Sequence, residues 1–175
     1  LGVYTLWWQH FCLGNPDSVH ATGSLAPTGV DADARVVLGW GPDVSGSSFS
    51  SMMVDLPIVG EVAGRDGLKI VVEPFVAPGG FRIERPGGGA VHWEDETALR
   101  WRDGLCYPAV AIAQHIADGR LEAPEHPLDT SIEVLALIDE SRRQIADASS
   151  SSSSSPSADC ESADTSPSWK VAKKT

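Results

Sequence analysis

Basic residues are scarce in this chain. Its 175 residues hold 13 Lys and Arg against 24 Asp and Glu, which gives a formal net charge of −11. Nucleic acids and anionic membrane surfaces both attract basic patches, so this balance argues against either partner. Apolar runs are also short: none approaches the roughly 18 residues of a membrane span, and no signal peptide is visible. The sequence therefore predicts no nucleic-acid and no membrane partner.

Cysteine is nearly absent and shows no pairing pattern. Cys12, Cys106 and Cys160 are far apart and odd in number, so they form neither a disulfide framework nor a C-x-x-C motif. We interpret Cys12 and Cys106 as buried, small apolar side chains. Together with the missing signal peptide, this usage indicates a reducing compartment, and we expect a cytoplasmic protein.

Familiar catalytic and cofactor motifs are missing too. There is no G-x-S-x-G and no H-E-x-x-H, and the five histidines lack metal-ligand spacing, so no metal site is predicted. His10 and His115 are interpreted as structural. Gly87-Gly88-Gly89 joins strand to strand, whereas a dinucleotide-binding loop needs spaced glycines and a helix N-terminus. Glu94-Asp95-Glu96 is interpreted as a solvated loop, because acid–base catalysis needs a carboxylate in an apolar setting.

The chain does have enough apolar content, 42%, and enough length for one domain with a core, which we place at residues 1–146. Residues 147–175 are rich in Ser, Asp and Pro. These residues offer almost nothing to bury, so this tail is predicted to be disordered. Two interpretations of its slightly basic end stay open: a docking or phosphorylation-regulated segment, or an extension without function.

Helical periodicity marks the start of the chain. In GVYTLWWQHFCLGNP, apolar residues recur at the i, i+3, i+4, i+7 spacing of one helix face, and Gly14-Asn15-Pro16 is a strong stop. Tyr4 and Trp8 lie one turn apart on a neighbouring face. The predicted inward stripe consists of Val3, Leu6, Trp7, His10 and Phe11.

Two more helices are predicted toward the end of the chain. The first has Pro108 at its first position and ends at Gly119. The second opens with a capping box from Thr130 to Glu133 and runs to about Ala146. Their predicted inward residues are Ala109, Ile112, Ala113 and Ile116 in the first, and Val134, Leu135, Ile138 and Ile145 in the second.

Short strand-like runs fill the middle of the chain. Asp66-Gly67 is a type I′ hairpin signal, because both central residues of that turn need positive φ. The serine-rich SGSSFSS fits either an edge strand or a loop. The order helix, antiparallel meander, two helices predicts an α+β fold, with a predominantly antiparallel open sheet and helices on one face. The predicted strands lie in DADARVVLGW, SSFSSMMVDLP, IVGEVAG, LKIVVEPF, FRIER and AVHWE.

A sheet covered on one face has a second face, which must be polar or must meet a partner.

Several stretches of the sequence are similar to motifs that follow one another in the same order in a known family. LGVYTLWWQHFCLGNPDSVHATG is similar to D-x-G-x-Y … L-G-x-P-x-x-V-x-A, and TGVDADARVVL to T-G-V-D before a strand. LPIVGEVAGRDGLKIVVEPFVAPGGFRI is similar to A-x-I-x-G-x-x-G-x-I-x-V-x-x-P-F. With the final stretch GLCYPAVAIAQHIADGRLEAPEHPLDTSIEVLALIDESRRQI, this order resembles the Gfo/Idh/MocA oxidoreductases, nearest their trans-1,2-dihydrodiol and D-xylose dehydrogenase branch.

The resemblance covers about residues 1–146 and implies the C-terminal domain of such an enzyme. Members carry an N-terminal Rossmann domain that binds NAD or NADP, which would precede this chain. The C-terminal domain supplies contacts to a small-molecule substrate, here a sugar or dihydrodiol-like alcohol, and a homo-oligomer interface through its sheet face. The isolated chain is expected to be inactive, with no cofactor-binding residue of its own.

The resemblance also implies site residues. Tyr4 holds the family's catalytic His/Tyr position, where a phenol exchanges the proton as hydride moves; an ordinary role as a residue facing a cleft stays open. Trp7 and Trp8 would line the substrate cleft or pack beneath Tyr4. Trp7 replaces an Asp common in inositol-type members, which favours a less hydroxylated substrate. Tyr107 is a further substrate-binding candidate. The Glu that members often carry after this Tyr, in a Tyr-x-x-Glu stretch, is missing here, with Pro108 and Ala109 following instead, and this favours core packing.

A second hypothesis belongs to a different class. The open sheet face would make this chain a non-catalytic oligomerisation or binding module. The reading frame upstream of Leu1 distinguishes the two, because a G-x-G-x-x-G-containing extension supports the enzyme and a start codon supports the module.

Overall fold

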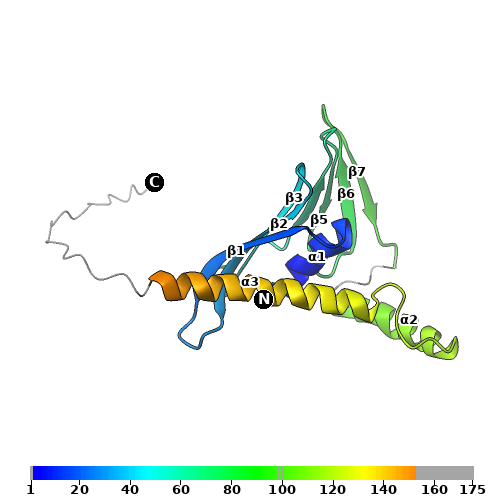
Figure 1. The fold of residues 1–175 in the computed structure, drawn as a ribbon. Helices are drawn as coiled ribbons and strands as arrows, with labels where there is room; N and C mark the ends of the chain where they lie inside the picture. Colours follow the sequence, from blue (N-terminus) through cyan, green and yellow to red (C-terminus); the bar gives the residue numbers. More distant parts are fainter. Residues whose placement is uncertain (1, 98, 100, 153–175) are drawn as a thin grey trace, which may run out of the picture.

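The computed structural model describes residues 2–97, 99 and 101–152, and within them the chain has the expected α+β arrangement (Figure 1). Two antiparallel sheets have the strand orders β1-β2-β3 and β4-β5-β6-β7. The elements are α1 Val3–Leu13, β1 Ser18–Leu25, β2 Asp31–Trp40, β3 Val44–Ser51, β4 Gly60–Ala63, β5 Lys69–Val72, β6 Gly80–Glu84, β7 Ala90–Glu94, the 3-10 helix η1 Trp101–Leu105, α2 Cys106–Ala117 and α3 Leu128–Ser152.

The core lies between the first sheet and two helices. Along β2, alternate residues are buried, because successive side chains of a strand point to opposite faces. The buried face of β2 meets Leu6 of α1 and Ile145 of α3. Helices α1 and α3 thus cover one face of this sheet. The core residues are Leu6, Ala21, Ala34, Val36, Leu38, Leu137 and Ile145.

Strand β1 was not predicted, because its sequence SVHATGSL is polar and contains a glycine. It pairs along its whole length with β2. A Cβ at Gly23 would collide with the Asp33 carbonyl oxygen, so the close approach of the two strands requires glycine here. The serine-rich segment, for which strand and loop were both open, is the edge strand β3.

The second sheet confirms the predicted hairpins but not the turn type. Gly67 has φ of 80°, as a turn requires. The Gly64 amide donates to the Leu68 carbonyl at 2.8 Å, which leaves a three-residue loop between β4 and β5, whereas a type I′ turn has two. The register places Glu61, Arg82 and His92 on one face of this sheet. That face is polar apart from the buried Val71, whereas the opposite face carries Ile70, Phe81, Val91 and Trp93, which are 36%, 38%, 46% and 54% exposed. The second sheet therefore has one polar face and one apolar face that is partly exposed.

Helix α1 spans the predicted segment and ends at Gly14, whose φ is 76°. Its buried residues are Leu6, Gln9 and His10. Val3 and Phe11, predicted to point inward, are 44% and 63% exposed. The prediction of the inward stripe was wrong at both positions, because α3 and β3 contact the side of the helix that carries Gln9 and His10.

The C-terminal helices depart from the prediction in more ways. Pro108 is the third residue of α2, because η1 leads directly into the helix. Gly119, with φ of 72°, ends it as expected. Helix α2 contacts η1 and extends away from the sheets (Figure 1), and none of its residues is buried. The inward stripe predicted for this helix was therefore wrong at Ala109, Ile112, Ala113 and Ile116. Helix α3 starts before Thr130, so the capping box does not form, and the Leu128 amide instead donates to the Glu122 carboxylate at 2.9 Å.

The last helix is also longer than predicted. Helix α3 continues past Ala146 to Ser152, so residues 147–152 of the predicted tail are helical. Serine hydroxyls support this extension: Ser149 donates to the Ile145 carbonyl at 2.9 Å. The rest of the predicted tail, 153–175, lies outside the described residues. Among the helices described, none has the length and hydropathy needed to cross a bilayer.

Candidate active site

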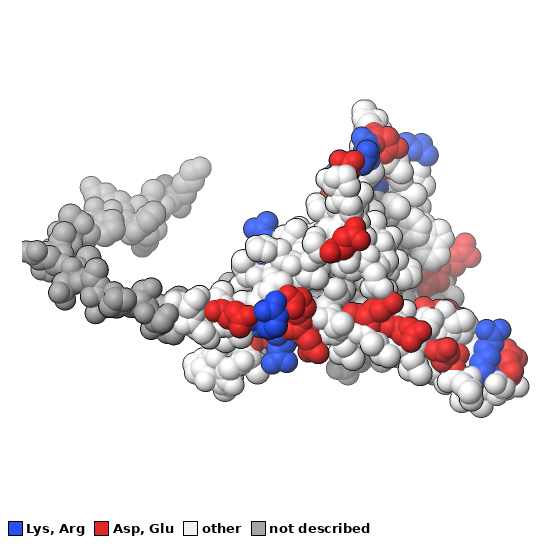
Figure 2. Space-filling model, viewed as in Figure 1, with Lys and Arg blue, Asp and Glu red and all other residues white. Residues whose placement is uncertain are grey.

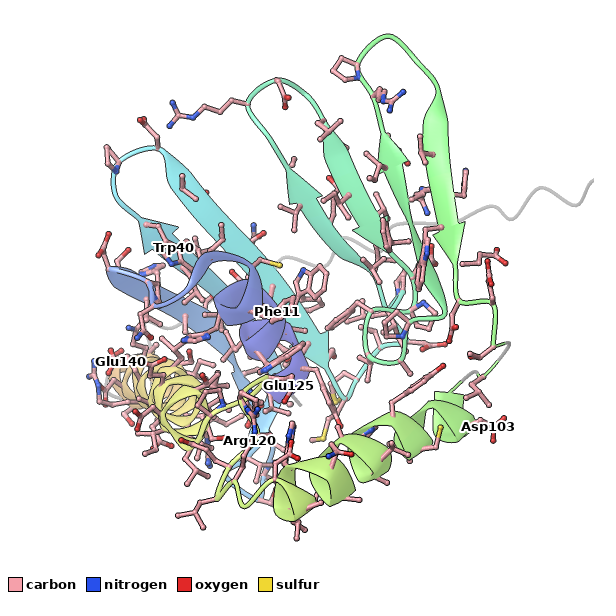
Figure 3. All side chains as sticks on the ribbon, turned by 90° about the vertical axis from the view of Figure 1, so that its right-hand side faces the viewer. Phe11, Trp40, Asp103, Arg120, Glu125 and Glu140 are labelled. Carbon is pink, nitrogen blue, oxygen red and sulfur yellow. The ribbon has the colours of Figure 1, made fainter. Side chains whose placement is uncertain are left out.

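A groove of about 670 Å³ runs between α1 and the facing edges of β3 and β4. Helix α1 lies in front of the strands in Figure 3 and forms one wall. The whole of β3 and β4 lines the groove, with one edge strand from each sheet. The α1 side chains that line it are Tyr4, Thr5, Trp8, Gln9, Cys12 and Leu13.

Tyr4 and Trp8, both predicted from the sequence, meet in this groove. They are four residues apart on α1 and so lie on one side of the helix. The Tyr4 side chain is 56% exposed, which leaves its phenol open to a molecule entering from solvent. Trp8 packs against Phe75 with ring centroids 5.8 Å apart. A Cβ on Gly60 would lie 2.9 Å from the Trp8 ring, so glycine allows the indole to rest on β4.

Trp7 and Tyr107, also predicted, lie away from the groove. The Trp7 indole donates to Nδ1 of His126 at 3.2 Å and stacks on Phe11. Tyr107 is 48% exposed on α2, so the prediction that it packs in the core was wrong. The Tyr107 hydroxyl donates to the Asp95 carboxylate at 2.7 Å.

The environment of Tyr107 also keeps its phenol protonated. Its hydroxyl lies 2.6 Å from that of Thr97, and this bond lowers the pKa of Tyr107. The bond to Asp95, partial desolvation and the Asp95 charge outweigh it, so the pKa of Tyr107 is raised above its ordinary value. Asp95, predicted to lie in a solvated loop, thus ties that loop to α2.

Gln9 is a groove residue that sequence reasoning missed. It is 6% exposed, and neither its Nε2 nor its Oε1 has a hydrogen-bond partner. A Cβ on Gly46 of β3 would collide with Gln9 Oε1, so the amide lies directly over this glycine. The signal in the sequence was the Gly within the serine-rich strand, which marks a close approach.

The groove can bind neutral polar groups better than anions. Its lining includes Asp55 and Glu61, the serines of β3 and the Thr5 hydroxyl, and no Lys, Arg or His among the described residues. Burial raises the pKa of the Cys12 thiol, so this side chain is a poor nucleophile at neutral pH. The other cysteine predicted to be buried, Cys106, is exposed. Within the described ranges, no cluster of three or more metal-ligating side chains occurs.

His10 behaves as the structural histidine that was predicted. Its Nε2 pairs with the Glu133 carboxylate of α3 at 2.8 Å. His115 pairs with Glu125 at 2.9 Å at the far end of α2, although its Nδ1 is buried without a partner. Neither histidine lines the groove.

Comparison with known proteins finds relatives but no matching family model. The chain is 22% identical over 163 residues to scyllo-inositol 2-dehydrogenase (NADP(+)) IolU of Bacillus subtilis, covering 83% of this chain and 43% of that protein. It is 28% identical over 153 residues to the trans-1,2-dihydrobenzene-1,2-diol dehydrogenase of Mus musculus, with coverages of 83% and 44%.

A solved structure shares the fold. UDP-N-acetylglucosamine 3-dehydrogenase GnnA from Acidithiobacillus ferrooxidans superposes with a TM-score of 0.65 at 20% identity, covering 83% of this chain and 45% of that one. The chain thus spans less than half the length of the proteins it matches. The order of its motifs, the two curated relatives and the shared fold together support a likeness to the C-terminal domain of the Gfo/Idh/MocA oxidoreductases.

Proposed function

We propose that this chain is the substrate-facing part of an NAD(P)-dependent oxidoreductase that transfers hydride between the nicotinamide and a sugar or dihydrodiol-like alcohol. The observation that carries the proposal is the Tyr4–Trp8 pair in the α1 groove. Two relatives support it by their names, since one oxidises an inositol and the other a dihydrobenzenediol. Both substrates are neutral rings that bear hydroxyl groups.

The groove offers complementary chemistry to such a ring. The Trp8 indole presents an aromatic surface, and the β3 serines, Thr5 and Gln9 offer neutral hydrogen-bonding groups. At the exposed end of the groove, the Tyr4 phenol would exchange a proton with a substrate hydroxyl or carbonyl. Trp8 and Gln9 would position the ring and keep water from its apolar edge.

The residues described do not fit a dinucleotide. Gly87, Gly88 and Gly89, all with positive φ, form the turn between β6 and β7, and no helix follows them. A pyrophosphate site needs the N-terminus of a helix after such a loop. We therefore propose that NAD or NADP is bound by a Rossmann domain outside this chain, and that the isolated chain is inactive.

The first experiment tests the enzyme hypothesis against the binding-module alternative. Extending the transcript sequence upstream of the Leu1 codon should reveal an open frame with a G-x-G-x-x-G motif. The purified chain alone, titrated with NADPH, should show no change in nicotinamide fluorescence. A start codon at this point would contradict the proposal, and so would micromolar binding of NADPH by the chain itself.

The second experiment tests Tyr4 in the complete enzyme. Tyr4→Phe should lower kcat for a ring diol such as trans-1,2-cyclohexanediol by about 10²- to 10⁴-fold, because proton transfer by a positioned side chain contributes that much. Tyr107→Phe removes the same hydroxyl outside the groove and serves as the matched variant. Equal loss in both, or loss in Tyr107→Phe alone, would contradict the assignment of Tyr4.

The sheet-face interface predicted from the resemblance stays a prediction. The polar face of the second sheet carries the ion pairs Glu61–Lys69 at 2.9 Å and Arg82–Glu84 at 2.7 Å. A homo-oligomer formed there would have to accommodate these charges. A non-catalytic binding module that used this face would have to accommodate the same charges.

A further inference from the structure

Gln9 carries an unused hydrogen-bonding amide at the border of the α1 groove. The side chain is 6% exposed, and both Nε2 and Oε1 are buried without a hydrogen-bond partner. In the part of the chain that the structure describes, the other buried side-chain atom without a partner is Nδ1 of His115, which lies outside the groove. Burying an unpaired amide costs free energy that an apolar side chain of similar size would avoid. An unpaired amide retained beside a groove therefore indicates a role in binding.

Helix α1 and strand β3 hold this amide at the groove. Thr5, Gln9 and Cys12 are spaced by four and three residues, so they lie on one side of α1, and all three line the groove. Across from them, a Cβ on Gly46 would collide with Gln9 Oε1, so glycine leaves the space that the amide occupies. Ser45, the residue before Gly46, lines the same groove. The amide thus lies where the helix and the strand meet beside the groove.

The chemistry of the amide selects the group that it binds. Nε2 donates hydrogen bonds and Oε1 accepts them, and a hydroxyl group can pair with either atom. A carboxylate or phosphate group only accepts, so it would leave Oε1 unpaired. The groove is also lined by the carboxylates of Asp55 and Glu61. Acidic side chains follow α3 on the face shown in Figure 2, and the net charge is −11. These charges repel anions, so a neutral hydroxyl is the best match.

We propose that Gln9 determines specificity by binding a substrate hydroxyl other than the one that exchanges a proton with Tyr4. The substrate is then a neutral ring with at least two hydroxyl groups. The Trp7 indole, on which the expectation of a less hydroxylated substrate rested, lies outside the groove. The amide meets the hydroxyl when the Gln9 side chain turns about its torsions. Gln9 is a positioning residue, and this inference rests on the proposed function because both concern the same groove.

Two ring alcohols test the inference in the complete enzyme. Cyclohexanol and trans-1,2-cyclohexanediol share the ring and a hydroxyl that can react, but only the diol has a second hydroxyl. Gln9→Met keeps the length of the side chain and removes the amide. It should lower kcat/KM for the diol at least about 10-fold, because a site built to bind a hydroxyl discriminates by that much or more. The value for cyclohexanol should stay nearly unchanged. Gln114→Met, on α2 and outside the groove, is the matched control and should change neither value.

The preference between the two alcohols decides the outcome. An equal fall for both in Gln9→Met would overturn the proposal, because a purely structural role affects both alike. A preference for the diol that survives the substitution would overturn it as well.

Thermal unfolding of the complete protein without cofactor separates this inference from the proposed function. The diol should raise the midpoint of the parent protein more than cyclohexanol does, and Gln9→Met should remove that difference. Equal shifts by the two alcohols in the parent protein would overturn the assignment of Gln9 alone. Failure of the proposed function would instead appear as a complete protein that binds the diol but oxidises neither alcohol with NAD or NADP.

Discussion

His10 Nε2 lies 2.8 Å from Glu133 Oε2, and this contact joins α1 to α3. His10 is 9% exposed and Glu133 is 38% exposed. The pair holds the helix that carries Tyr4 and Trp8 against the helix that covers the first sheet. Glu133, which was predicted to belong to the capping box of its own helix, therefore helps to position α1, which forms one wall of the groove.

Removing this contact should destabilise the fold. Glu133→Ala leaves the largely buried imidazole without its partner, and we expect the free energy of unfolding to fall by about 1 kcal/mol. Glu125→Ala breaks the similar contact to His115, but Glu125 is 67% exposed, so its loss should lower the free energy of unfolding less. Urea denaturation measures both. Equal effects would show that burial of the pair is unimportant.

Gly46→Ala should be strongly unfavourable for a steric reason. Its new Cβ would collide with Gln9 Oε1, and Gln9 is buried, so we expect a loss of about 1–3 kcal/mol. Gly104→Ala, with open space around the added Cβ, is the control. The double variant Gly46→Ala/Gln9→Ala should recover part of the loss, measured as the urea midpoint. No recovery would mean that another group opposes the new methyl.

Gln9→Met should stabilise the chain or leave its stability unchanged. Both polar atoms of the Gln9 amide are buried without partners, which costs free energy that a thioether of similar size avoids. Thermal unfolding with and without a ring diol distinguishes the roles of Gln9. If the amide positions substrate, the variant should gain stability alone but lose the shift caused by the diol. A clear fall in midpoint without ligand would contradict this account.

Gln144 should stabilise the fold, because its side-chain amide forms hydrogen bonds with two backbone groups of β1. Its Oε1 accepts from the Ala21 amide at 2.7 Å, and its Nε2 donates to the Val19 carbonyl at 3.0 Å. Gln144→Ala leaves both backbone groups without these bonds, so we expect a loss of about 1–3 kcal/mol. Gln114→Ala, which breaks a bond to Asp118 on the exposed α2, is the matched control. Similar losses in the two variants would contradict the role of Gln144.

Glu140 should contribute to the acid dependence of stability. The Arg143 guanidinium binds both of its oxygens, at 2.6 and 2.8 Å, and Gln144 donates to it at 2.8 Å. These bonds lower the pKa of Glu140 from 4.5 to about 2. Because the folded value is the lower one, the contribution is present above about pH 4.5 and is lost as the pH falls toward 2.

Glu140→Gln should therefore reduce the loss in the free energy of unfolding as the pH falls from about 4.5 to about 2. Urea midpoints measured across that range should differ less with pH in the variant than in the parent chain. Glu140 is exposed to solvent, so added salt should shrink the difference. Asp139→Asn controls for the loss of one negative charge from α3. An identical acid dependence in Glu140→Gln and the parent would contradict the assignment.

Much of the fold was predictable because it follows from local patterns. The alternation from Asp31 to Trp40 predicted β2 with its observed bounds. Gly14 and Gly119 ended their helices as expected, since both have the positive φ that glycine tolerates. Strand β1 escaped prediction because its pairing with β2 and its cover by α3 compensate for a polar sequence.

The candidate site was only partly predictable. The family resemblance named Tyr4 and Trp8 as site residues, and their spacing of one turn placed them on one side of a helix, which does not depend on the rest of the chain. Trp7 does not line the groove, because its indole donates a hydrogen bond to His126 in the loop before α3. His126 is 119 residues away in the sequence, so this contact could not be predicted from local spacing. Gln9 gave no local signal, because its burial depends on Gly46 of a distant strand.

The sequence by itself determined the order of helices and strands, the ends set by glycine and the helix that carries Tyr4 and Trp8. These features depend on backbone preferences and on periodicity within a few residues. Only the tertiary structure decided which side of α1 is buried, that Glu133 pairs with His10, and that the residues of α2 are not buried. Each of these depends on contacts between residues far apart in the chain, and the free energy of such contacts is set by which surfaces meet.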